Sequence, residues 1–157
     1  AYEGARVHFI GHLQTNKVKQ VVGKVDLIES VDRMELLECI EKTAAKLGIV
    51  QPILLEVNIG GEESKGGIPA EELHGLLEEA ARKPHLHVCG LMTIPPKTDV
   101  EKYFFRMQKL FIDISAENMD NIDMHVLSMG MSGDYVEAIK YGSTLVRIGS
   151  ALFGARG

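Results

Sequence analysis

Residues 53–59 are Ile-Leu-Leu-Glu-Val-Asn-Ile, and this stretch decides the fold class of the chain. A short run that is apolar at nearly every position is typical of a strand in a parallel sheet with both faces covered. It is followed by a segment with apolar residues three or four positions apart, 70–82, and then by a second apolar run, 86–92. Strand, helix and strand in this order predict a parallel βαβ unit.

The same alternation extends over the whole chain. Short apolar runs predict six strands, at 7–10, 25–28, 53–59, 86–92, 124–127 and 144–148. Between them, apolar residues at helical spacing predict five helices, at 13–22, 33–47, 70–82, 100–118 and 135–141. We therefore expect a single α/β domain over residues 1–157.

Two architectures share this alternation, an open doubly wound sheet and a closed (β/α)8 barrel. Six units are too few to close an eight-stranded barrel, which usually needs ~250 residues, so an open sheet is the simpler interpretation. Polar and glycine-rich residues follow the carboxyl ends of several predicted strands, where both architectures place their functional sites. Periodicity alone leaves the choice open.

The composition excludes several classes of protein. The 157 residues are 45% hydrophobic and carry a net charge of −5, which indicates a packed domain without the basic surface that binds nucleic acid. The longest uncharged apolar stretches are far shorter than the ~20 residues of a membrane-spanning helix. Cys39 and Cys89 are 50 residues apart, which favours free thiols in the cytoplasm over a zinc site or a redox pair.

Two glycine-bearing segments predict a binding site for an anion. Residues 127–134, Leu-Ser-Met-Gly-Met-Ser-Gly-Asp, offer backbone N–H groups beside Gly130 and Gly133. Residues 146–154, Val-Arg-Ile-Gly-Ser-Ala-Leu-Phe-Gly, end the next strand with Gly149 and a hydroxyl donor. In (β/α)8 barrels a phosphate is commonly held by the loops after the last two strands. For each segment by itself, the alternative that its glycines only terminate a strand stays open.

Arg147 is the candidate contact for the remainder of such a ligand. It lies two residues before Gly149, so a strand would project both residues from one face near its end. A guanidinium in a barrel mouth needs an acceptor, and the ring nitrogen of a phosphorylated heterocycle would serve. Because guanidinium keeps its proton, that nitrogen would stay unprotonated. A solvated arginine at the strand end is the alternative.

The histidines and the polar loop carry weaker signals. His8 and His12 lie on a strand followed by a glycine turn, which does not provide the i, i+4 face that zinc-binding helices use. We expect hydrogen-bonding or capping roles for both, and no metal site. The loop 58–67 is long and polar, and its Lys65 is either a phosphate contact or a solvated lysine.

Five motifs in order give the chain a family resemblance. They are residues 8–17, which are His-Phe-Ile-Gly-His-Leu-Gln-Thr-Asn-Lys, and residues 58–67, 90–92, 127–134 and 146–154. In these segments the chain resembles the pyridoxal phosphate homeostasis protein family, also called YggS or PROSC, over essentially its whole length. The resemblance implies the (β/α)8 barrel of the alanine racemase type, with pyridoxal 5′-phosphate as cofactor and without established turnover.

The same resemblance implies roles for individual residues. Ser132, Gly149 and Ser150 would hold the phosphate, with help from the backbone around Met131. Arg147 would face the pyridine nitrogen. The resemblance implies neither a catalytic residue nor a metal ligand among them.

Three more residues would complete the pocket. Asn58 and Met92 would line it from neighbouring strand ends, and Ser128 would lie beneath the ring. The family holds its cofactor as a Schiff base with a lysine at the end of the first barrel strand, whereas this chain begins near the third. No segment resembles that motif, since Lys17 and Lys65 belong to other motifs of the family. We therefore expect the last six βα units of a barrel, either part of a longer molecule or completed by another chain.

The resemblance implies a carrier or buffer that stores pyridoxal 5′-phosphate and delivers it to cofactor-dependent apoenzymes. The alternative is an amino acid racemase of the same fold, which needs a second acid–base residue, typically tyrosine or lysine, across the ring. None of the four tyrosines lies at a predicted strand end, which favours the carrier. A barrel that binds another phosphorylated metabolite is the third hypothesis.

Overall fold

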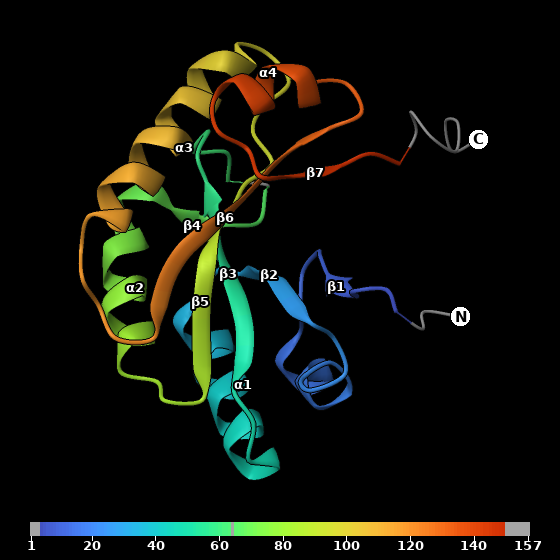
Figure 1. The fold of residues 1–157 in the computed structure, drawn as a ribbon, viewed down its shortest axis with the longest axis vertical. Coiled ribbons are helices and arrows are strands. Elements are labelled where there is room, and N and C mark those ends of the chain that lie inside the picture. Colours follow the sequence, from blue (N-terminus) through green and yellow to red (C-terminus); the bar gives the residue numbers. More distant parts are fainter. Residues whose placement is uncertain (1–3, 64, 150–157) are drawn as a thin grey trace.

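The computed structural model describes residues 4–63 and 65–149, which form one curved parallel sheet covered by helices (Figure 1). Within these residues the sheet order is β1-β2-β3-β5-β6-β7, and every neighbouring pair is parallel. The strands are β1 (His8–Phe9), β2 (Leu27–Val31), β3 (Gln51–Asn58), β5 (Leu86–Met92), β6 (Ile122–Met131) and β7 (Leu145–Arg147). The order follows the chain, as expected for consecutive right-handed crossovers.

The sequence did not predict the short strand β4 (Ile68–Pro69), which pairs with the end of β3 off the main path of the sheet. Two residues are too few to produce a recognisable pattern of side chains. The strand ties the long loop after β3 back onto the sheet, because Val57 pairs with Ile68.

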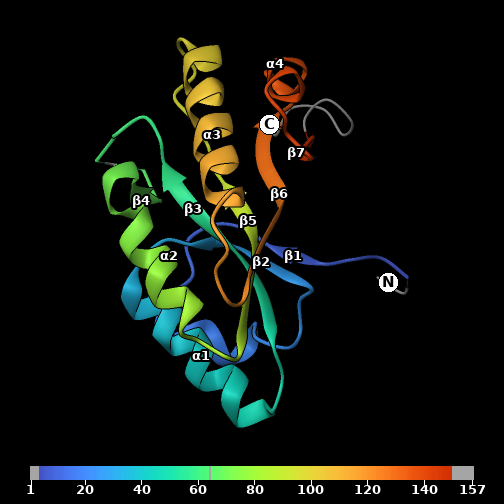
Figure 2. The same cartoon turned by 60° about the vertical axis from the view of Figure 1, so that its left-hand side comes forward.

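The helices connect successive strands and lie along one face of the sheet (Figures 1 and 2). They are α1 (Met34–Leu47), α2 (Leu73–Ala81), α3 (Val100–Ser115) and α4 (Tyr135–Lys140), with the 3-10 turn η2 (Ala70–Glu72) leading into α2. Leu36, Leu37, Ile40 and Ala44 of α1 are fully buried, which is the stripe that helical spacing predicts. No helix in the described part of the chain is long and apolar enough to cross a membrane.

The first predicted helix, 13–22, is wrong in type. The structure has a 3-10 helix there, η1 (Thr15–Gln20), closed by the bonds from Lys17 N to Gln14 O and from Val21 N to Val18 O. Both bonds span three residues, as in 3-10 geometry. Val18 and Val21 are β-branched and lose side-chain freedom in an α-helix, and Val18 is fully buried in the 3-10 geometry.

Two predicted strands end later than the sequence suggested. The strand expected at 25–28 lies at Leu27–Val31, and the one expected at 124–127 extends from Ile122 to Met131. In both cases the extension contains polar residues, Glu29 and Ser30 in β2 and Ser128 in β6. Their polarity suggested a loop, whereas the structure shows that they are buried strand residues.

Apolar side chains pack on both faces of the sheet. The main core lies between sheet and helices and includes Ile28, Ile53 and Leu127. The opposite face holds a separate cluster of Leu27, Leu54, Cys89 and Met92, against which Val126 packs. Neighbouring residues such as Leu27 and Ile28 therefore enter different cores, in agreement with the alternation of side chains along a strand. We call the face of Leu27 and Leu54 the inner face.

The sheet is curled, and this excludes the open doubly wound alternative. Strands β2 and β6 are three strand spacings apart in the sheet order, which is about 14 Å in a flat sheet. Nevertheless, Ser128 Oγ on β6 lies 2.6 Å from Glu29 Oε1 on β2. The inner face is concave, as in a (β/α)8 barrel, and the helices cover only the outer face (Figures 1 and 2). The barrel-type fold is thereby confirmed for this part of the chain.

Candidate functional site

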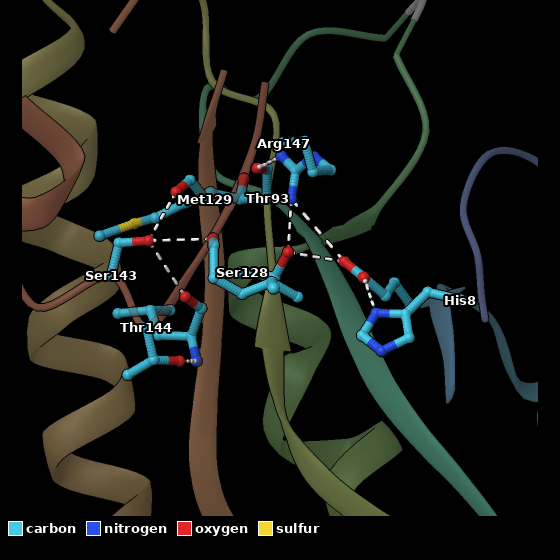
Figure 3. Close-up of polar contacts among 10 residues, drawn as sticks. His8, Thr93, Ser128, Met129, Ser143, Thr144 and Arg147 are labelled. Carbon is cyan, nitrogen blue, oxygen red and sulfur yellow. Dashed lines mark hydrogen bonds and ion pairs between the residues drawn. The ribbon is translucent and has the colours of Figure 1, made fainter. Parts of the chain in front are cut away.

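A buried arginine lies at the carboxyl end of the inner face. The side chain of Arg147, on the last described strand β7, is only 12% exposed. Its Nη2 donates to the carbonyl oxygen of Thr93 at 3.1 Å, and its Nη1 donates to Ser128 Oγ (Figure 3). Thr93 follows β5, so the guanidinium reaches across the intervening strand β6.

The hydroxyl of Ser128 connects Arg147 to a buried carboxylate. Ser128 Oγ donates to Glu29 Oε1 at 2.6 Å, and the Nη1 of Arg147 lies 3.7 Å from the same oxygen. The other carboxylate oxygen, Glu29 Oε2, lies 2.7 Å from Nδ1 of His8. Figure 3 shows these contacts as one line of side chains that runs from Arg147 to His8. We call Arg147, Ser128, Glu29 and His8 the arginine network.

The arginine network is largely buried, so its polar groups must satisfy one another's hydrogen bonds. Glu29 is 1% exposed and Ser128 is fully buried, so neither group can exchange its partner for water. A buried ion is stable only when its hydrogen-bonding capacity is filled, because removing it from water costs several kcal/mol. In the arginine network, contacts from Ser128 and His8 to the two Glu29 oxygens meet that requirement.

The turn before β7 fixes where Arg147 falls. Ser143 Oγ lies 2.6 Å from the Met129 carbonyl oxygen, to which it donates, and Thr144 Oγ1 accepts a bond from the Leu127 N–H at 2.8 Å (Figure 3). These contacts tie the start of β7 to β6, and Arg147 then pairs in register with Met131. The backbone of Arg147 therefore lies beside Met131, whereas its side chain extends back along β6 and places the guanidinium beside Ser128.

The charges around Arg147 are mixed. Burial lowers the pKa of Arg147 from its ordinary value, while the carboxylates of Glu29, Glu56 and Asp134 raise it in part. Burial and the nearby charge of Asp32 raise the pKa of Glu56 to about 7, and Arg147 lowers it in part. Glu56 is thus a second buried carboxyl group whose pKa depends in part on Arg147.

The two glycine-bearing segments line one common cleft, as the sequence predicts for a shared anion site. The cleft is bordered by loop residues after β5 and by both segments, and the following residues of the two segments line it: Gly130, Met131, Ser132, Gly133, Asp134, Arg147 and Gly149. Gly130 has a φ of 103°, and a Cβ there would lie 2.7 Å from Cβ of Ala138. Glycine at this position lets β6 turn closely against α4.

The predicted site residues fall into four groups, of which the last is Asn58 and Met92. Ser132, Met131, Arg147 and Gly149 line the cleft, although the Met131 N–H donates to Asp134 Oδ1 at 2.7 Å. Ser128 lies buried below, where it contacts Arg147 as described. Ser150 lies outside the described residues.

Asn58 and Met92 do not border the cleft within the described residues. The amide of Asn58 holds its own loop, since Nδ2 donates to the Glu62 carbonyl oxygen at 2.6 Å and Oδ1 accepts from the Glu62 N–H at 3.1 Å. Met92 is buried in the inner apolar cluster. That these two residues line the ligand pocket stays a prediction.

Sequence reasoning missed Glu29 and Thr93. Glu29 lies inside a strand with the pattern Leu-Ile-Glu-Ser-Val, and a charged residue in such a run is the signal that could have identified it. Thr93 contributes its backbone carbonyl to Arg147, so its side chain carries no sequence signal for this role. Its own hydroxyl donates to the Val57 carbonyl oxygen at 2.6 Å and thereby holds the chain in place after β5.

The other polar candidates have simpler roles. His8 is hydrogen-bonded to Glu29, as expected, and His12 is exposed. Lys65 lines the cleft, where its Nζ donates to the Pro95 carbonyl oxygen at 3.3 Å and pairs with Glu62 at 3.2 Å. Over residues 4–63 and 65–149, no group of three His, Cys, Asp or Glu side chains is placed to hold a metal ion.

Comparison with known proteins assigns this fold to a family. The family model for the alanine racemase N-terminal domain matches residues 2–157, so the chain belongs to that family. It is 50% identical over 153 residues to the pyridoxal phosphate homeostasis protein of Aquifex aeolicus, which confirms the resemblance seen in the motifs. The alignment covers 95% of this chain and 66% of that relative, so the chain spans about two thirds of its length.

Solved structures show the same relationship. A crystal structure of an unknown protein from Bifidobacterium adolescentis is 38% identical, with a TM-score of 0.89 over 93% of this chain and 60% of that one. PipY of Synechococcus elongatus, whose structure has PLP bound, is 28% identical, with a TM-score of 0.85 over 96% of this chain and 71% of that one. The fold found here is therefore shared with a protein that binds PLP.

Proposed function

We propose that this chain provides the ring- and phosphate-binding part of a protein that binds pyridoxal 5′-phosphate in the homeostasis of that cofactor. The observation that carries the proposal is the position of Arg147. Its buried guanidinium lies on the inner face, and it borders the same cleft as Ser132 and Gly149 of the two glycine-bearing segments. A ligand with an anion at one end and an aromatic acceptor at the other would engage both parts.

The donor set fits this cofactor. A guanidinium has five N–H donors, and within the described residues Ser128 and Thr93 accept from two of its nitrogens. Further N–H groups are thus available for a ring nitrogen, which they would keep unprotonated. Ser132, Gly149 and Ser150 would hold the phosphate, and the basic side chain of Lys65 borders the cleft. The bound cofactor supplies a reactive aldehyde, which a buffer would store and release to apoenzymes in the cytoplasm.

The carrier is favoured over a racemase of the same fold by the lining of the cleft. A racemase needs an acid–base group on each side of the substrate carbon, typically a tyrosine or a lysine. In the described part of the chain no tyrosine borders the cleft, and Lys65, one of the lysines that line it, is bonded to the Pro95 carbonyl oxygen and paired with Glu62. Tyr141 instead donates from its hydroxyl to Glu101 Oε1 at 3.3 Å and packs edge-on against Phe105.

The proposal is tested by the affinity of the full-length protein for pyridoxine 5′-phosphate, which lacks the aldehyde and reports non-covalent contacts only. Arg147→Ala and Ser132→Ala should each weaken binding roughly tenfold, because each removes hydrogen bonds to an ionic or buried acceptor. Arg82→Ala is the control, since Arg82 is an exposed arginine paired with Glu79 on α2. Unchanged affinity in both site variants would refute the assignment of the site.

A further inference from the structure

The arginine network contains a carboxylate that the proposed function does not explain. Glu29 does not line the cleft in the described part of the chain, yet it is buried and shares its two oxygens between Ser128 and His8. A buried ion pair contributes little net stability compared with apolar residues of the same volume. Stability alone is therefore a weak reason for a charge at this place.

The hydrogen-bond directions show what Glu29 does to Ser128. A serine hydroxyl has one proton and two lone pairs. Because an ionised carboxylate can only accept, the Ser128 proton must point to Glu29 Oε1, which leaves the lone pairs for Arg147 Nη1. Glu29 thus determines that Ser128 is an acceptor for the guanidinium.

Glu29 also acts on the charge of Arg147 directly. Their closest side-chain atoms, Nη1 and Oε1, are 3.7 Å apart in a site from which water is largely excluded. Burial lowers the pKa of the guanidinium, and Glu29 is the first of the carboxylates that oppose this shift, ahead of Glu56 and Asp134. Glu29 therefore both orients Arg147 and stabilises its positive charge.

We propose that Glu29 is a positioning residue for the ring-nitrogen contact of the ligand. Acting through Ser128, it holds the guanidinium of Arg147 at the level of Thr93, so that the N–H groups that remain face an acceptor on the ligand ring. Glu29 then contributes to the choice of ligand: it favours a phosphorylated aromatic ring with an unprotonated nitrogen over one without it. This inference rests on the proposed function.

Two probes separate this role from a structural one. Pyridoxine 5′-phosphate carries the phosphate and the ring nitrogen, whereas benzyl phosphate carries a phosphate and a ring without nitrogen. We expect Glu29→Gln and Ser128→Ala in the full-length protein to weaken the binding of pyridoxine 5′-phosphate roughly tenfold, which is the value of one charge-assisted hydrogen bond. The affinity for benzyl phosphate should change less than threefold. Glu29→Gln keeps the shape of the side chain and removes its charge.

The matched control is Glu56→Gln, which removes another buried carboxyl group close to Arg147. No hydrogen bond links Glu56 to Arg147 or Ser128 within the described residues. In Glu56→Gln the ratio of the affinity for pyridoxine 5′-phosphate to the affinity for benzyl phosphate should therefore change less than threefold. Equal weakening of both probes by Glu29→Gln would show a structural role and overturn the inference, as would unchanged binding of both. A wild-type protein that does not distinguish the probes would instead refute the ring-nitrogen contact of the proposed function.

Discussion

The close approach of β5 and β6 at Gly90 leads to a quantitative prediction for Gly90→Ala. Gly90 pairs with Val126, and a Cβ added at Gly90 would lie 1.7 Å from the Val126 carbonyl oxygen. Because real Cβ atoms essentially never approach closer than 3.0 Å, the two backbones must separate by more than 1 Å. A displacement of that size breaks the hydrogen bonds of a ladder that are set by a separation of about 2.9 Å.

The cost can be estimated from the ladder that would open. The pairs Gly90 with Val126, Leu91 with Leu127 and Met92 with Ser128 are consecutive in β5 and β6. Losing two or three backbone hydrogen bonds at ~1 kcal/mol each, together with the strain of alanine at a φ of 156°, predicts a loss of at least about 3 kcal/mol.

Gly75→Ala is the matched control, because the same substitution there should raise the free energy of unfolding instead of lowering it. Gly75 is an exposed residue in the first turn of α2, and a Cβ there would meet no atom within 4 Å. Alanine should stabilise this helix by about 0.5–1 kcal/mol. Urea unfolding followed by circular dichroism measures both free energies. A Gly90→Ala protein within 1 kcal/mol of the wild type would refute the reasoning.

Two further predictions concern buried polar groups. Thr93→Val removes the hydroxyl that donates to the Val57 carbonyl at 2.6 Å and should cost about 1–3 kcal/mol, whereas Thr43→Val, at a helical hydroxyl bonded to the Cys39 carbonyl, should change stability by less than about 0.5 kcal/mol in urea unfolding. For Glu56 the folded pKa of about 7 exceeds the ordinary glutamate pKa of 4.5, so the folded protein binds more protons than the unfolded protein between these pH values. Its unfolding free energy should therefore fall as pH rises from about 4.5 to 7, by at most about 3 kcal/mol, and a Glu56→Gln protein should lack this loss when both are unfolded at pH 5 and pH 8.

Local patterns were sufficient to predict most of the elements. Continuous apolar runs mark buried parallel strands, and the stripe from Leu36 to Ala44 marks a helix, because both depend only on which side chains must leave water. The same locality caused the errors at the ends of β2 and β6. Glu29 and Ser128 are polar, and a polar residue on an inner face cannot be told from one in a loop until its partner is known.

The sequence likewise predicted part of the candidate site and missed the rest. Glycine and serine at the ends of two adjacent strands predict an anion site without knowledge of the fold, and Arg147 follows from its spacing to Gly149. The contacts of Arg147 were not accessible, since Thr93 contributes a backbone carbonyl that any residue possesses.

By itself, then, the sequence determined the α/β class, the parallel direction of the strands and the two glycine-bearing segments, because these depend on residues close together in the chain. Only the tertiary structure decided between an open sheet and a barrel, and only it brought Glu29 to Ser128 across 99 residues of sequence. The physical reason is curvature. Whether side chains on β2 and β6 meet depends on how far the whole sheet bends, and that is set by packing on both of its faces at once.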